Sequence, residues 1–124
     1  MKIEFRKIGF DKKPFSLDLK SDDFDIKING SIYREQSSVR DGLIKLDSTM
    51  SGTIKLVCDI SGEEFIKDIS EEVIIFVKNG YYEETHIDEN LAVVEVFDNF
   101  IDLDSIFLGE IESLKLDYHR IDII

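Results

Sequence analysis

The chain has 124 residues and a mass of 14.3 kDa, with 43% hydrophobic residues, 34% charged residues and a formal net charge of −12 at pH 7. This length is enough for one hydrophobic core, so residues 1–124 are predicted to form a single domain. No apolar run is long enough to cross a bilayer, and the charged beginning of the chain differs from a secretory signal, so we expect a cytoplasmic location and no membrane partner.

The first twenty residues are basic although the chain as a whole is acidic. They carry six basic and three acidic side chains, a net charge of +3, which leaves −15 over residues 21–124. Phenylalanines alternate with the basic side chains, and such a mixture can contact RNA phosphates and stack on bases. The residues considered for this RNA contact are Lys2, Arg6, Lys7, Lys12 and Lys13. Half-buried strands produce the same alternation, and we favour that interpretation of the phenylalanines.

Alternation of apolar and polar residues predicts the early strands. Residues 3–8 and 15–19 form the first two, separated by a turn over residues 9–13, and Pro14 stands where a strand tolerates a missing N–H. Residues 24–28 then lead to Asn29-Gly30, with Ile32 beyond it. Because Asn-Gly is the dipeptide that type I′ turns prefer, a hairpin turn is predicted at Asn29-Gly30.

The same alternation continues through the middle of the chain. Residues 43–47 and 52–60 are predicted strands, and the second places Cys58 on its apolar side. After a turn at Ser61-Gly62, the apolar alternation of residues 65–69 is expected to differ in phase from the denser apolar run 73–77. That run is predicted to be a central strand ending at Asn79-Gly80. Residues 81–90 are predicted to form a loop, and residues 91–99 one more strand.

A single helix is predicted, over residues 102–116. Asp102 or Asp104 can accept hydrogen bonds from the first-turn N–H groups, and apolar residues recur at helical spacing. Those on one face are Ile106, Phe107, Ile111 and Leu114. The predicted fold class is therefore α+β, mostly antiparallel β with one short C-terminal helix.

No catalytic residue, metal site or cofactor is predicted. A thiol enzyme would pair Cys58 with His86 or His119, but no motif links them, and an inert packing role for the cysteine is favoured. The acidic residues around His86 fit a solvated loop better than a metal site. Adjacent glutamates on a strand point to opposite faces, so they do not form a two-carboxylate site. A small thiol- or carboxylate-dependent enzyme and an oligomeric scaffold remain as alternatives.

Two short motifs carry a resemblance to a known family. The pattern Gly-x-apolar-x-apolar-x-Cys is followed, after an acidic variable stretch, by Asp-Leu and a helix that contains a glutamate. The first motif is made by Gly52, Ile54, Leu56 and Cys58, and the second by Asp102, Leu103, Glu110, Leu114 and Leu116. In this layout the chain resembles the YceD family, proteins named for large ribosomal RNA subunit accumulation.

Two departures from the family pattern bear on function. Ser61 occupies the position at which the family pattern has its second cysteine, and this serine excludes a two-thiol metal or redox centre. Residues 117–120 replace the closing proline motif of the family. The resemblance implies a role in ribosome assembly or in accumulation of large-subunit ribosomal RNA, without catalysis.

If the chain acts in ribosome assembly, its acidic surface suits binding to a protein better than binding to RNA. A protein of charge −12 has few counterions to displace from RNA, whereas opposite charge speeds encounter with a basic partner. A basic ribosomal protein or assembly factor is therefore the favoured partner, with rRNA contact through the N-terminal stretch as the alternative. The acidic residues expected to bind it are Asp59, Glu63, Glu64, Asp68, Glu71 and Glu72. A merely solvated strand face explains them equally well.

Overall fold

The computed structural model describes residues 1–35, 42–80 and 92–117. The chain begins with strand β1 (Lys2–Glu4) and a 3-10 turn, η1 (Phe5–Lys7). Strands β2 (Lys13–Lys20), β3 (Phe24–Arg34), β4 (Ile44–Val57) and β5 (Glu64–Asn79) follow. Two short strands, β6 (Val93–Val96) and β7 (Phe100–Asp102), precede helix α1 (Leu103–Asp117).

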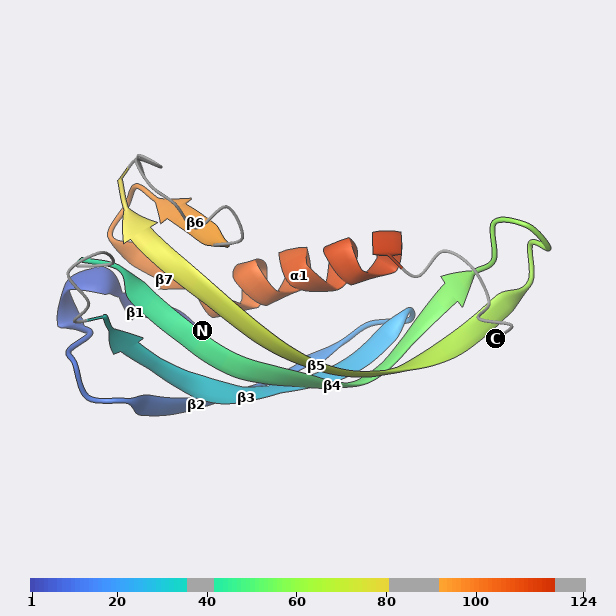
Figure 1. The fold of residues 1–124 in the computed structure, drawn as a ribbon, viewed down its shortest axis with the longest axis horizontal. Coiled ribbons are helices and arrows are strands. Elements are labelled where there is room, and N and C mark those ends of the chain that lie inside the picture. Colours follow the sequence, from blue (N-terminus) through green and yellow to red (C-terminus); the bar gives the residue numbers. More distant parts are fainter. Residues whose placement is uncertain (36–41, 81–91, 118–124) are drawn as a thin grey trace.

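The long strands form a curved sheet with the helix on its concave side (Figure 1). The five-stranded sheet has the order β2-β3-β4-β5-β6, antiparallel except for the parallel pair β5–β6, and β1 pairs with β7 in a separate two-stranded sheet. This arrangement confirms the predicted α+β class. We call the face that carries α1 the inner face, and the opposite one the outer face.

The core lies between the inner face and α1. Alternate residues of β2, β3, β4 and β5 are turned toward it, because successive side chains of a strand point to opposite faces. The helix contributes Leu103, Phe107 and Ile111, which are all fully buried, and the Phe107 ring lies 5.9 Å from that of Phe15. Burial of side chains of this size stabilises the fold by about 1.5 to 3 kcal/mol each before entropy is counted.

The hairpin turn predicted at Asn29-Gly30 is wrong, because both residues lie inside β3. The chain reverses earlier, at residues 21–23, where the Ser21 N–H donates to the Phe24 carbonyl and the Asp23 N–H to Ser21 Oγ. Gly30 is needed for a different reason. A Cβ there would lie 2.7 Å from Ser48 Cα on the neighbouring strand, so the glycine permits close strand approach.

Several predicted strands also join or shift. The predicted strands over 43–47 and 52–60 are parts of one strand, β4, which ends at Val57, so residues 58–60 belong to the turn. Residues 65–69 share the inward phase of 73–77 within β5, since odd-numbered residues face inward along its length. The first predicted strand, residues 3–8, is only β1, which η1 follows. The predicted loop at 81–90 lies outside the described residues.

Candidate functional site

The β4–β5 hairpin ends in a turn that extends beyond the end of α1 (Figure 1). The Cys58 N–H donates to the Glu63 carbonyl (2.9 Å) and the Gly62 N–H to the Cys58 carbonyl (2.8 Å). Gly62 has φ +73°, a conformation that favours glycine. Ser61 Oγ accepts a hydrogen bond from the Glu63 N–H, so a turn hydroxyl occupies the position of the missing second cysteine.

Cys58 is buried directly after β4, as predicted, and its thiol is not in a disulfide. His86 and His119, its proposed partners, lie outside the described residues. No group of three or more metal-ligating side chains occurs in the described part of the chain. The described surroundings of Cys58 therefore fit a packing role.

An apolar patch covers the hairpin tip. Val57, Ile60 and Ile66 are 55%, 74% and 72% exposed. Val57 and Ile66 point to the outer face because their neighbours Leu56 and Phe65 are paired across the strands and point inward. Large aliphatic side chains gathered at an exposed tip are typical of an interaction site.

Most of the predicted acidic residues surround this patch. Asp59 and Glu63 are exposed in the turn, and Glu64 and Asp68 lie on the outer face of β5, before and after Ile66. Glu72 lies farther along the same face. Glu71 points to the inner face, so three of the six predicted residues share the outer face of β5 and two lie in the adjoining turn.

The hairpin tip, defined as Val57, Ile60 and Ile66 with the carboxylates of Asp59, Glu63, Glu64 and Asp68, is the candidate site. At this site, Lys55 Nζ lies 3.1 Å from Glu64 Oε2. Sequence reasoning found the acidic residues but not the apolar centre. The sequence does contain a sign of this apolar centre: Val57 and Ile66 are apolar residues at strand positions where the alternation otherwise places polar ones.

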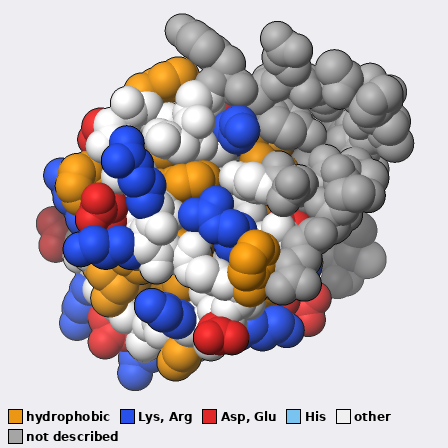
Figure 2. All heavy atoms as spheres, turned by 90° about the vertical axis from the view of Figure 1, so that its left-hand side faces the viewer, with side chains coloured by type: hydrophobic (Ala, Val, Ile, Leu, Met, Phe, Trp, Pro, Cys, Tyr) orange, Lys and Arg blue, Asp and Glu red, His pale blue; other side chains and the backbone are white. Residues whose placement is uncertain are grey.

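The predicted RNA-contact residues lie at the opposite end of the sheet. All five are exposed, and Figure 2 shows Lys and Arg side chains with acidic ones between them over this end. Phe5 and Phe15 are buried, which confirms a core role for these two, whereas Phe10 is 53% exposed. Lys12 Nζ lies 5.2 Å from the centre of the Tyr33 ring. Lys12 thus lies over one face of this ring.

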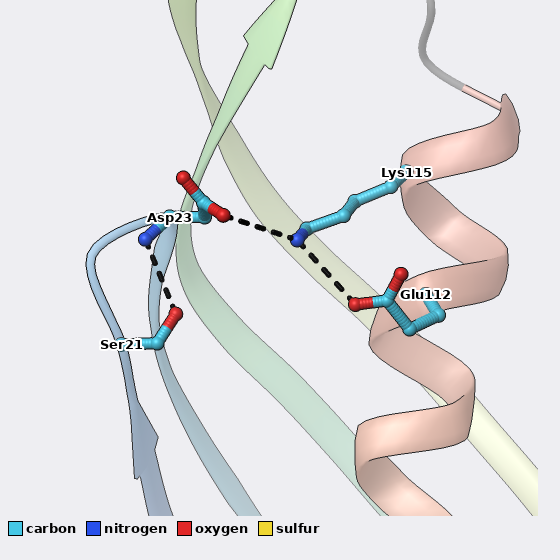
Figure 3. A network of polar contacts seen from close by, with 4 residues as sticks. All are labelled: Ser21, Asp23, Glu112 and Lys115. Atoms are coloured by element: carbon cyan, nitrogen blue, oxygen red, sulfur yellow. Dashed lines mark hydrogen bonds and ion pairs between the residues drawn. The ribbon is translucent and has the colours of Figure 1, made fainter.

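Helix α1 is anchored at both ends by polar contacts. At its start Asp102 accepts hydrogen bonds from the backbone N–H (3.4 Å) and the hydroxyl (3.1 Å) of Ser105, and the backbone bond lowers the pKa of Asp102. Near its end Lys115 Nζ lies 3.7 Å from Asp23 and 3.4 Å from Glu112 (Figure 3). The contact between Lys115 and Asp23 ties the helix to the β2–β3 turn.

Glu110, the glutamate of the family-like helix, makes stability depend on pH. Partial burial raises the pKa of its carboxyl above the ordinary value of 4.5. The folded state therefore holds this proton more tightly than the unfolded state, so the contribution of Glu110 to stability is fully present below pH 4.5 and is lost as pH rises through the raised pKa. We expect Glu110→Gln to remove this dependence, as measured by urea unfolding at a series of pH values. A stability difference between the two proteins that is constant with pH would contradict it.

Comparison with protein-family models, with curated proteins and with solved structures finds no match to this chain. No helix in the described ranges has the length and apolar character needed to span a membrane.

Proposed function

We propose that this protein is a non-enzymatic, cytoplasmic binding module that acts in the accumulation of large-subunit ribosomal RNA. Its hairpin tip recognises a basic ribosomal protein or assembly factor. The observation that carries the proposal is the apolar patch of Val57, Ile60 and Ile66 surrounded by carboxylates. The resemblance to the YceD family supplies the ribosomal context.

The composition of the tip suits a basic amphipathic partner. Interfaces commonly have an apolar centre and a polar rim, and the exposed aliphatic side chains here supply such a centre. The surrounding carboxylates attract and orient a cationic surface, an effect that acts on the association rate more than on affinity. A single hairpin tip offers a small contact area, so we expect a transient complex that weakens in high salt.

The experiment is a pull-down of the tagged protein with large-subunit precursor particles at low and high salt. Asp59→Lys/Glu63→Lys reverses charge at the tip, and Asp18→Lys/Asp22→Lys makes the same net change in exposed acids away from it. We expect only the tip variant to lose association, by about tenfold at low salt. Ile60→Ser/Ile66→Ser should weaken it as well, while thermal unfolding confirms that each variant is folded.

Two outcomes would count against the proposal. Equal loss in both charge variants would mean that net charge alone, and not the tip, controls association. Loss after ribonuclease treatment, together with sensitivity to Lys2→Glu/Lys13→Glu, would favour rRNA contact through the basic end instead.

A further inference from the structure

A pocket of about 670 Å³ lies at the end of the sheet opposite the hairpin tip. It is lined by residues of β1 and η1, by residues 13–16 at the beginning of β2, and by Ile32 and Phe100. Its lining is largely apolar, and a volume of this size is typical of ligand sites. The pocket belongs to neither the hairpin tip nor the polar network of α1.

In the described part of the chain, the β2 wall of the pocket is an open strand edge. β2 is the outermost strand of the five-stranded sheet, and the Ser21 N–H donates to the Phe24 carbonyl at the beginning of its pairing with β3. In an antiparallel pair, every second residue bonds to the partner strand, so the odd-numbered residues of β2, such as Phe15, bond to β3. The backbone polar groups of the even-numbered residues Pro14 and Ser16 therefore point away from β3. Pro14 lacks an N–H, which costs nothing on this side. The edge therefore offers the Pro14 carbonyl and both polar groups of Ser16.

Among the described strands β1 pairs with β7 alone, so its other side is an open edge as well. The Leu103 N–H donates to the Met1 carbonyl and the Phe5 N–H to the Asn99 carbonyl, so odd-numbered residues of this segment bond to β7. By the same alternation the backbone groups of Lys2 and Glu4 point away from β7. Both residues line the pocket. Within residues 1–35, 42–80 and 92–117, these outward backbone groups bond to no other strand.

The charged groups at the pocket are mainly lysines. Lys2, Lys7 and Lys13 line it together with one acid, Glu4. Glu4 is already engaged, since its Oε2 lies 3.3 Å from Lys7 Nζ and its Oε1 accepts a hydrogen bond from Asn99 Nδ2 (3.3 Å). Among the described residues no ion pair involves Lys2 or Lys13. The pocket thus combines apolar walls, cations and unpaired strand edges.

We propose that this pocket binds an extended segment of a partner protein, in which apolar residues alternate with acidic ones. The segment pairs with the outward groups of Pro14 and Ser16, which is strand addition to an open sheet edge. Its apolar side chains fill the pocket and its carboxylates lie beside Lys2 and Lys13. This inference goes beyond the proposed function and does not depend on it, because the two sites lie at opposite ends of the sheet.

The test uses fluorescence anisotropy with a fluorescein-labelled octapeptide of alternating valine and glutamate. The control peptide has the same composition, with the four valines in one block. Ser16→Pro removes the outward N–H without removing a bond to β3, and Ser16→Ala is its matched control, because both variants lose the bond from Ser16 Oγ to Asn29. We expect the alternating peptide to bind, and Ser16→Pro to weaken it by about fivefold or more while Ser16→Ala does not.

A second pair of variants keeps the test valid if proline disturbs the fold. Lys2→Glu/Lys13→Glu should weaken the peptide by about tenfold at low salt, whereas Lys20→Glu/Lys27→Glu, with the same net change outside the pocket, should have little effect. Equal binding of the block peptide, or unchanged binding in folded Ser16→Pro, would overturn the proposal. Binding of decanoate without binding of the peptide would also overturn it and assign the pocket to a small amphiphilic anion. The hairpin-tip variants should leave peptide binding unchanged, so failure at one site is distinguishable from failure at the other.

Discussion

Gly52→Ala is expected to destabilise the protein by about 3 to 5 kcal/mol, enough to threaten folding of a small domain. Gly52 lies inside β4 with φ +145°, which side chains rarely permit. A Cβ there would also overlap the Asp25 carbonyl oxygen and lie 2.9 Å from Ile26 Cα on β3. Backbone cannot move aside as a flexible side chain can. Urea unfolding monitored by circular dichroism measures the loss.

Gly109→Ala is the matched control for that change. Gly109 lies in α1, and a Cβ there would meet no atom within 4 Å. Alanine is the better helix former, so this variant should gain about 1 kcal/mol of stability. If Gly52→Ala costs no more than an ordinary surface substitution, the close approach of β4 to β3 is not required by the fold.

Phe107→Ala is expected to cost about 3 to 5 kcal/mol, because it removes a fully buried ring and leaves a cavity between the helix and the sheet. The ring contacts Phe15 on β2, so its loss also weakens the attachment of α1 to the edge strand beside the pocket. The measurement is again the free energy of unfolding, together with far-UV circular dichroism for helix content.

Leu116→Ala provides the control on the same helix. Leu116 is 77% exposed, so its truncation should change stability by about 0.5 kcal/mol or less. Equal effects of the two substitutions would contradict the burial of one helix face against the sheet. The peptide test can be repeated with Phe107→Ala if that variant stays folded, since its core change lies close to the proposed strand edge.

The family-like motifs gain a structural explanation from these contacts. Gly52 permits close packing of β4 on β3, Ile54 and Leu56 point into the core, and Cys58 is buried where the hairpin turn begins. Asp102 caps the helix that follows. These roles maintain the scaffold. The proposed recognition surfaces lie elsewhere, at the hairpin tip and at the open edge of β2.

Alternation in the sequence was sufficient to predict a β-rich chain, the location of β2, the burial of Cys58 and one helix near the C-terminus. Each of these depends on local periodicity, which records whether a residue faces the core. The acidic stretch could be identified in the same way, because charge is a property of the residues themselves. Its apolar centre was overlooked since Val57 and Ile66 belong to strands whose other face forms the core.

Tertiary structure decided what periodicity does not contain. Asn29-Gly30 has the local chemistry of a turn, yet it continues β3 because pairing with both β2 and β4 outweighs the preference of one dipeptide. The parallel addition of β6, the strand order and the pocket between β1 and β2 depend on contacts between residues far apart in the chain. Sequence alone determined which side chains seek the core; only the packing of distant strands determined which edges and carboxylates remain open to a partner.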